Sequence, residues 1–141
     1  MFSHHPIRDL GGYRGAFWKS LVSHRVDAYL CGHLHFYNRS QPGDNGTWQV
    51  IVGTAGAPQY APSPSVTGTT IPSQYGVATV DVDGPTVKVM FYGDTDGDGH
   101  YNDVMDSFVL SAPSHTEELA PGTAPVPAPK LDRPGCLMPS F

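Results

Sequence analysis

Two histidine-containing segments constrain the fold of this chain more than any other feature. The motif SHHP occupies residues 3–6, and the motif GHLH occupies residues 32–35. Each motif ends an apolar stretch, and in open α/β sheets binding sites form where the strands end. Imidazole is also the commonest side-chain ligand for metal ions. The sequence therefore predicts two neighbouring β-strands that carry histidines to one shared metal site.

The spacing within each motif indicates which rings should face that site. Side chains two residues apart on an extended segment share a face, whereas adjacent side chains point to opposite faces. We therefore expect His33 and His35 to point into the site together, and we do not expect both His4 and His5 to face it. Gly32 has no Cβ, so we expect it to let the backbone turn sharply off the strand end. Two imidazoles placed in this way can serve two metal ions about 3.5–4 Å apart.

The remaining pattern predicts a β-rich α/β fold. Apolar side chains at helical spacing predict a helix, and short apolar or alternating runs predict strands. Alternating residues on both sides of Asp-Gly-Pro predict a β-hairpin. The expected elements are the end of a strand at 1–3, a helix at 16–23, strands at 26–31 and 48–54, a hairpin of 77–82 with 87–92, and a strand at 107–110.

Composition limits the domain organisation and the classes of partner. Seven of the 14 prolines lie in residues 111–141, which have few large apolar side chains, so we expect a Pro-rich disordered tail there and one domain over residues 1–110. The net charge of −5 argues against nucleic acid as a partner. The sequence has no run of 18 apolar residues, so we expect no membrane span. Cys31 and Cys136 are interpreted as free thiols.

The segments FSHHP and VDAYLCGHLHFYNRSQP resemble the calcineurin-like metallophosphoesterases, most closely the purple acid phosphatase branch. That branch carries a Val-x-x-His motif followed by x-Pro, and a Gly-His-x-His motif that leads into an aromatic residue and a Tyr-x-Arg run. Met1 stands here at the Val position, and Phe36, Tyr37 and Arg39 continue the second motif. Three further segments, VIVGTAGAP, YGVATVDVDG and DSFVL, look like the C-terminal sheet of the same domain.

The resemblance implies a fold, an activity and a set of ligands. The fold would be the C-terminal part of a four-layer metallophosphoesterase β-sandwich flanked by helices. By likeness, His4 and His33 would bind the more exchangeable of two metal ions, and His35 its partner, drawn from Fe, Zn or Mn. His5 would contact the substrate or face solvent. The reaction would be hydrolysis of phosphate monoesters by a metal-activated water, in a protein that is secreted or periplasmic.

The departures from the family motifs predict an incomplete site. The bridging aspartate, the Asn ligand and the Gly-Asn-His motif of the family should precede His4, and none is present. Neutral imidazoles without a carboxylate cannot hold two divalent cations 4 Å apart against their repulsion. We therefore expect a fragment or a truncated reading frame that is inactive alone, and we assign no catalytic residue.

A second segment offers an alternative function. Asp94, Asp96 and Asp98, followed by Gly99 and Asn102, match several positions of an EF-hand-like calcium loop. The twelfth position of that pattern is Met105, which cannot coordinate calcium, and Asp106 comes one residue late. A solvated turn explains the same residues without a ligand. The alternative hypothesis is a small β-rich calcium-binding or interaction module.

Overall fold

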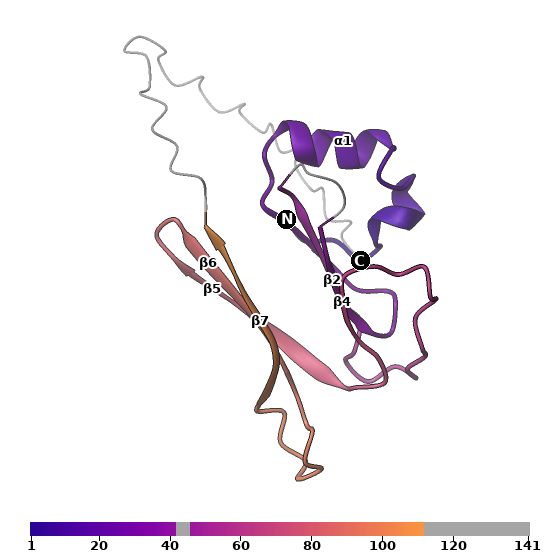
Figure 1. The fold of residues 1–141 in the computed structure, drawn as a ribbon, viewed down its shortest axis with the longest axis vertical. Helices are drawn as coiled ribbons and strands as arrows, with labels where there is room; N and C mark the ends of the chain where they lie inside the picture. Colours follow the sequence, from indigo (N-terminus) through magenta and orange to yellow (C-terminus); the bar gives the residue numbers. More distant parts are fainter. Residues whose placement is uncertain (42–45, 112–141) are drawn as a thin grey trace, which may run out of the picture.

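A computed structural model describes residues 1–41 and 46–111 and shows a mostly β protein with little helix (Figure 1). The predicted tail at 111–141, with Cys136, lies outside the described residues except for Ser111. The helix predicted at 16–23 is confirmed with the same bounds. The elements are η1 (Ile7–Leu10), α1 (Ala16–Ser23), β1 (Ala28–Cys31), β2 (Tyr37–Ser40), β3 (Trp48–Val52), β4 (Thr69–Ile71), β5 (Gly76–Asp83), β6 (Thr86–Gly93) and β7 (Asp103–Ser111).

The first sheet has the strand order β1-β3-β2-β4 and positions both histidine motifs. Strands β1 and β3 are parallel, and β2 is antiparallel to β3 and to β4. The first residues of the chain extend this sheet beyond β1, since Phe2 forms a parallel bridge with Leu30. The hydrogen bonds continue to the ends of both segments, where the Gly32 N–H donates to the His4 carbonyl at 3.0 Å. Both motifs therefore leave adjacent parallel segments at the same edge.

The second sheet is antiparallel, with the order β5-β6-β7, and it packs against one face of the first sheet. The Tyr37 ring on β2 stacks on Phe91 of β6, with the ring centroids 4.2 Å apart. Arg39 on β2 binds Asp106 on β7 through two hydrogen bonds, Nε to Oδ2 at 2.7 Å and Nη2 to Oδ1 at 3.1 Å. The Tyr37 hydroxyl donates to the same carboxylate at 2.7 Å. Apolar packing and a polar network thus join the two sheets.

Helix α1 and η1 cover the other face of the first sheet, where they bury the second half of the core (Figure 1). Trp18 and Leu21 of α1 and Ile7 of η1 pack there on Tyr29 and Ile51. The described residues therefore form three layers, helix on sheet on sheet. A further helical layer, which a four-layer sandwich requires, is not among the described residues. Within the same ranges, no helix has the length and hydropathy needed to traverse a bilayer.

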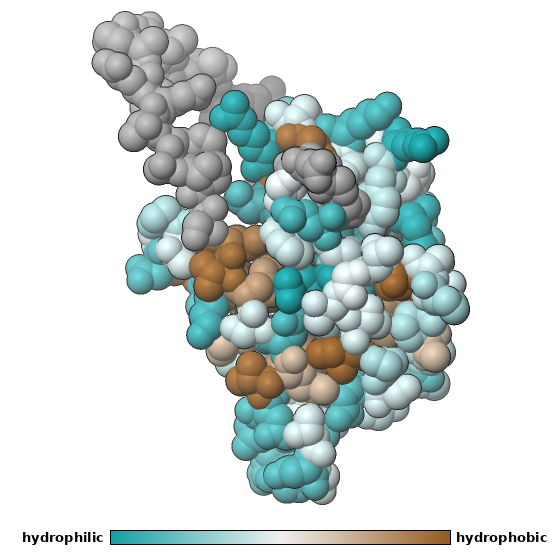
Figure 2. Space-filling view, in the orientation of Figure 1, coloured by the Kyte–Doolittle hydropathy of each residue, from teal (hydrophilic) through white to brown (hydrophobic). Residues whose placement is uncertain are grey.

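The outward face of the second sheet exposes several apolar side chains. Val77 of β5 and Val104 and Val109 of β7 are all more than half exposed. Figure 2 shows brown patches separated by polar surface where Figure 1 draws this sheet. The apolar side chains are therefore dispersed over the sheet.

Candidate metal centre

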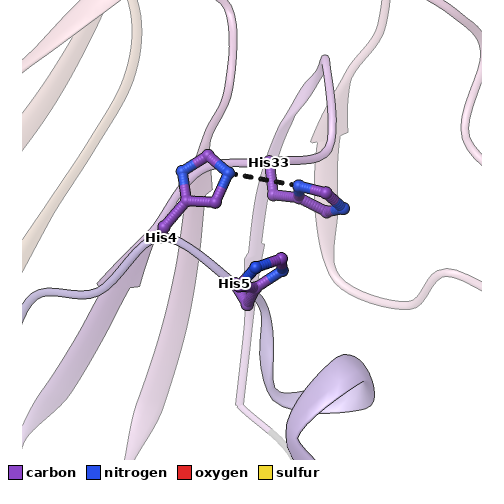
Figure 3. A group of neighbouring side chains, drawn as sticks. All are labelled: His4, His5 and His33. Atoms are coloured by element: carbon purple, nitrogen blue, oxygen red, sulfur yellow. Dashed lines mark hydrogen bonds between the residues drawn. The ribbon is translucent and has the colours of Figure 1, made fainter.

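Three imidazoles converge where the two histidine motifs meet. His4, His5 and His33 each offer a ring nitrogen, and these atoms all lie within 4.8 Å of one another. We call these three residues the histidine cluster. Figure 3 shows the rings of His4 and His5 on one segment facing the ring of His33 on the other. All three residues are exposed, so the nitrogens are open to ions and small molecules from solvent.

The spacing of two of these nitrogens fits tetrahedral metal coordination. His33 Nδ1 lies 3.2 Å from His4 Nε2. Zinc–imidazole bonds of about 2.0–2.1 Å at tetrahedral angles place two ligand nitrogens about 3.3 Å apart. Imidazole ligands suit zinc, copper, iron and nickel better than magnesium or calcium. The donor set therefore fits a divalent transition-metal ion.

The backbone is left-handed at His33, the cluster residue that belongs to the second motif. His33 has φ +66°, an uncommon conformation for a residue that has a Cβ. The turn off the strand therefore occurs at His33, whereas the sequence analysis placed it at Gly32, whose φ is not left-handed. Backbone strain of this kind persists only where the surrounding structure imposes it, and it is frequent at functional sites.

The left-handed backbone at His33 also explains why the His33 and His35 side chains do not share a face. Because the backbone from 33 to 35 is not extended, the rule that side chains two apart share a face does not apply there. His35 lies outside the histidine cluster: its Nδ1 is 2.7 Å from the Pro58 carbonyl, and its ring packs beside Tyr60. His5 lies in the cluster although it neighbours His4, since the chain bends there and the rings of His4 and His5 meet edge to face.

Asp9 is a site residue that the sequence analysis missed. Its Oδ2 lies 3.9 Å from His5 Nδ1 and 3.9 Å from His33 Nε2, and it is the one carboxylate within 4.0 Å of the cluster in residues 1–41 and 46–111. The sequence contains part of the information that places Asp9 at the site, because His5 and Asp9 are four residues apart. The contact with His33 depends on the fold. The site therefore contains negative charge that motif comparison did not predict.

The acidic loop between β6 and β7 brings together the three predicted calcium ligands. One oxygen from each of Asp94, Asp96 and Asp98 lies within 4.8 Å of the others. Backbone amides already bind these carboxylates: Gly97 N–H donates to Asp94 Oδ1 at 2.8 Å, and Gly99 N–H donates to Asp94 Oδ2 at 3.0 Å. Asp106, the acidic residue nearest the twelfth position of the pattern, is instead engaged by Arg39 and Tyr37.

Comparisons with known proteins add a weak likeness in fold. No family model matches the sequence, and no curated protein matches it. Among solved structures, the chain is similar to wild-type Vps29 of Entamoeba histolytica complexed with zinc, with 19% identity and a TM-score of 0.41 over 70% of this chain and 46% of that one. A single mutant of the same protein gives 19% identity and a TM-score of 0.40 over the same shares. The chain thus spans less than half of the Vps29 chain.

Proposed function

We propose that this chain carries part of the metal centre of a calcineurin-like metallophosphoesterase, and that its histidine cluster binds a divalent transition-metal ion. One observation carries the proposal: imidazoles from residues 4, 5 and 33 converge to within 4.8 Å. The motif resemblance of the two histidine segments supports the same assignment. We retain the purple acid phosphatase branch, and with it a secreted or periplasmic location, as part of the proposal on the motifs alone.

The chemistry proposed for the complete centre is hydrolysis of phosphate monoesters. A bound ion supplies Lewis acidity and a water molecule of lowered pKa. His4, His5 and His33 hold the ion at the exposed edge of the first sheet, where a phosphate ester can reach it from solvent. His35 remains a proposed ligand of a second ion: its Nδ1 lies 2.7 Å from the Pro58 carbonyl, a contact that leaves Nε2 as the ligand atom.

The number of carboxylates near the histidine cluster limits how many metal ions this chain can bind. Two divalent ions about 4 Å apart repel each other strongly, and bridging carboxylates normally offset that repulsion. Asp9 supplies one carboxylate near the cluster, at 3.9 Å from two rings and on the periphery of the site. We therefore propose that the chain alone binds one ion and does not turn over phosphate esters efficiently.

Calorimetry with zinc, manganese and cobalt chlorides tests the binding step, and hydrolysis of p-nitrophenyl phosphate tests the second step. The proposal predicts one bound transition-metal ion per chain, lost in His33→Ala, and negligible turnover. Absence of binding, or binding that His33→Ala leaves unchanged, contradicts the metal assignment. Rapid turnover by the unaltered chain contradicts the proposal that the site is incomplete.

A second candidate function is calcium binding by the acidic loop, which the convergence of Asp94, Asp96 and Asp98 favours. Calcium prefers six to eight oxygen ligands, and the three carboxylates offer oxygen atoms as their ligand atoms. Calorimetry with calcium chloride separates the candidates. Micromolar binding that Asp94→Ala abolishes and His33→Ala leaves intact supports the calcium module, whereas absence of calcium binding removes it.

A further inference from the structure

Asp9 lies on a short turn that the fold fixes next to the histidine cluster. The turn is η1, whose Ile7 side chain is fully buried and whose Ile7 N–H donates to Gln49 Oε1 at 2.9 Å. Gly12 N–H closes the turn on the Ile7 carbonyl at 2.8 Å. Asp9 follows the anchored residue by two positions, so its backbone is held in place. Its side chain is 31% exposed and can respond to an ion nearby.

The two oxygens of the Asp9 carboxylate have different neighbours. Oδ1 accepts a hydrogen bond from Arg8 Nε at 3.1 Å. Oδ2 faces two imidazole nitrogens, His5 Nδ1 and His33 Nε2, each at 3.9 Å. These separations exceed a hydrogen bond of 2.7–3.2 Å by less than about 1.2 Å. Oδ2 and either nitrogen must therefore approach each other by roughly 0.7–1.2 Å to form a hydrogen bond.

The two nitrogens of His33 face opposite partners. Nδ1 lies 3.2 Å from His4 Nε2, whereas Nε2 lies 3.9 Å from Asp9 Oδ2. A neutral imidazole has one N–H donor and one lone pair, and the hydrogen bond at one nitrogen determines which nitrogen can bind a metal. An N–H at Nε2 leaves the lone pair on Nδ1, directed toward His4. The positions of the atoms suit a carboxylate–histidine–metal arrangement.

We propose that Asp9 is a positioning residue of the metal centre: its carboxylate accepts the Nε2–H of His33 and so presents the Nδ1 lone pair to the ion. The same Oδ2 accepts from Nδ1–H of His5, which leaves Nε2 of His5 as the ligand atom. Asp9 itself stays outside the coordination sphere. The inference rests on the proposed metal binding by the histidine cluster and adds a specific role to a residue outside both motifs.

This arrangement accounts for two features that the motifs leave unexplained. The left-handed backbone of His33, at φ +66°, turns its ring between His4 and Asp9. The Arg8 guanidinium, held on Oδ1, leaves Oδ2 available to the rings. A purely structural role for Asp9, as the exposed partner of Arg8, requires neither the ring orientation nor the shared Oδ2.

Zinc affinity of matched variants of the full chain tests the inference. Removal of a carboxylate that orients a ligating histidine typically lowers metal affinity by about 10–100-fold. We expect that loss in Asp9→Asn, with Asp9→Glu recovering part of it. Asp81→Asn is the matched control, since it removes one negative charge from an exposed position on β5.

Nitrogen-15 NMR of the imidazoles supplies a readout that a structural role would not move. In the zinc-bound chain we expect His33 to be metal-bound at Nδ1 and protonated at Nε2, and cobalt-loaded Asp9→Asn to show an altered visible spectrum. Equal zinc affinity in Asp9→Asn and Asp81→Asn, or zinc on Nε2 of His33, overturns the role of Asp9. If the unaltered chain binds no zinc, the proposed function itself fails, so the two failures are distinguishable.

Discussion

His33 Nδ1 lies 3.2 Å from His4 Nε2, although 29 residues separate them in the sequence. The contact exists because the first residues of the chain pair in parallel with β1, so that both motifs leave the first sheet side by side. Local spacing determines neither the pairing nor its register. A metal centre at this edge therefore depends on the sheet as much as on the histidines.

The GHLH turn packs closely on β3, which makes Gly53 a structural requirement of the site. A Cβ at Gly53 would overlap the carbonyl group of Leu34, whereas a Cβ at Gly32 would meet only the Val52 carbonyl oxygen at an ordinary 3.6 Å. We expect Gly53→Ala to destabilise the fold by roughly 1–3 kcal/mol, as overpacking does, and to weaken zinc binding. Urea denaturation and zinc calorimetry check both effects, with Gly32→Ala as the control. Equal stability of the two variants would contradict this account of the turn.

The Arg39–Asp106 pair is expected to stabilise the contact between the two sheets. The two side chains are 19% and 10% exposed, and Arg39 also lies over the Phe108 ring, 4.7 Å from its centroid. Removal of one partner leaves the other buried without its counter-charge, so we expect Asp106→Asn to cost roughly 2–4 kcal/mol of unfolding free energy. Urea denaturation measures the loss. Asp81→Asn, an exposed change of the same charge, should alter stability by less than about 0.5 kcal/mol.

The same pair predicts how stability depends on acid. Burial acts to raise the pKa of Asp106, but hydrogen bonds from Arg39 and Tyr37 outweigh it and hold that pKa below its ordinary value of 3.8. The folded state therefore binds this proton more weakly than the unfolded state. The contribution of Asp106 is complete well above pH 3.8, starts to decline as the carboxyl of the unfolded chain gains a proton, and is lost as the pH falls through the lowered pKa of the folded state.

Asp106→Asn should therefore flatten the acid dependence of unfolding free energy below about pH 5, where the carboxyl begins to gain a proton in the unfolded state. Denaturation midpoints measured at a series of pH values test the expectation. Parallel curves for Asp106→Asn and the unaltered chain would rule out a lowered pKa at this residue.

Cys31 is expected to be an unreactive thiol in the folded chain. It is buried on β1, and burial, with the nearby negative charge of Asp9 as a smaller cause, raises its pKa from 9.0 to about 12. Because the thiolate is the reactive form, iodoacetamide should modify Cys31 very slowly at pH 8. Mass spectrometry of a Cys136→Ser variant isolates this thiol, and modification in urea provides the control. Rapid alkylation without urea would show that β1 opens.

Helix α1 and the β5–β6 hairpin could be predicted because their patterns are local. The periodicity of residues 16–23 and the alternation around the Asp-Gly-Pro turn each contain the information within a few residues. Strand β2 was missed because YNRS has no strand-like pattern. Its buried Asn38 donates to the Thr67 carbonyl and to Thr70 Oγ1, both at 2.9 Å, and these partners are distant in sequence. A buried polar strand cannot be distinguished from a loop without its partners.

The sequence predicted that histidines form the candidate site, but it predicted only some of the residues that belong to it. The motifs placed His4 and His33 in a common site, and the structure brings them together. The expectations for His5 and His35 assumed an extended backbone. The chain instead bends at His5 and is left-handed at His33. Asp9 belongs to neither motif, so only the folded turn of η1 brings it to His33.

Zinc calorimetry on the unaltered chain and on His33→Ala, with His24→Ala as the matched control, tests the central claim most directly. His24 is an exposed histidine at the end of α1, outside the cluster. The account predicts one zinc ion per chain, an affinity loss in His33→Ala greater than the 10–100-fold effect of an orienting residue, and no change in His24→Ala. Equal zinc binding by all three proteins would contradict it.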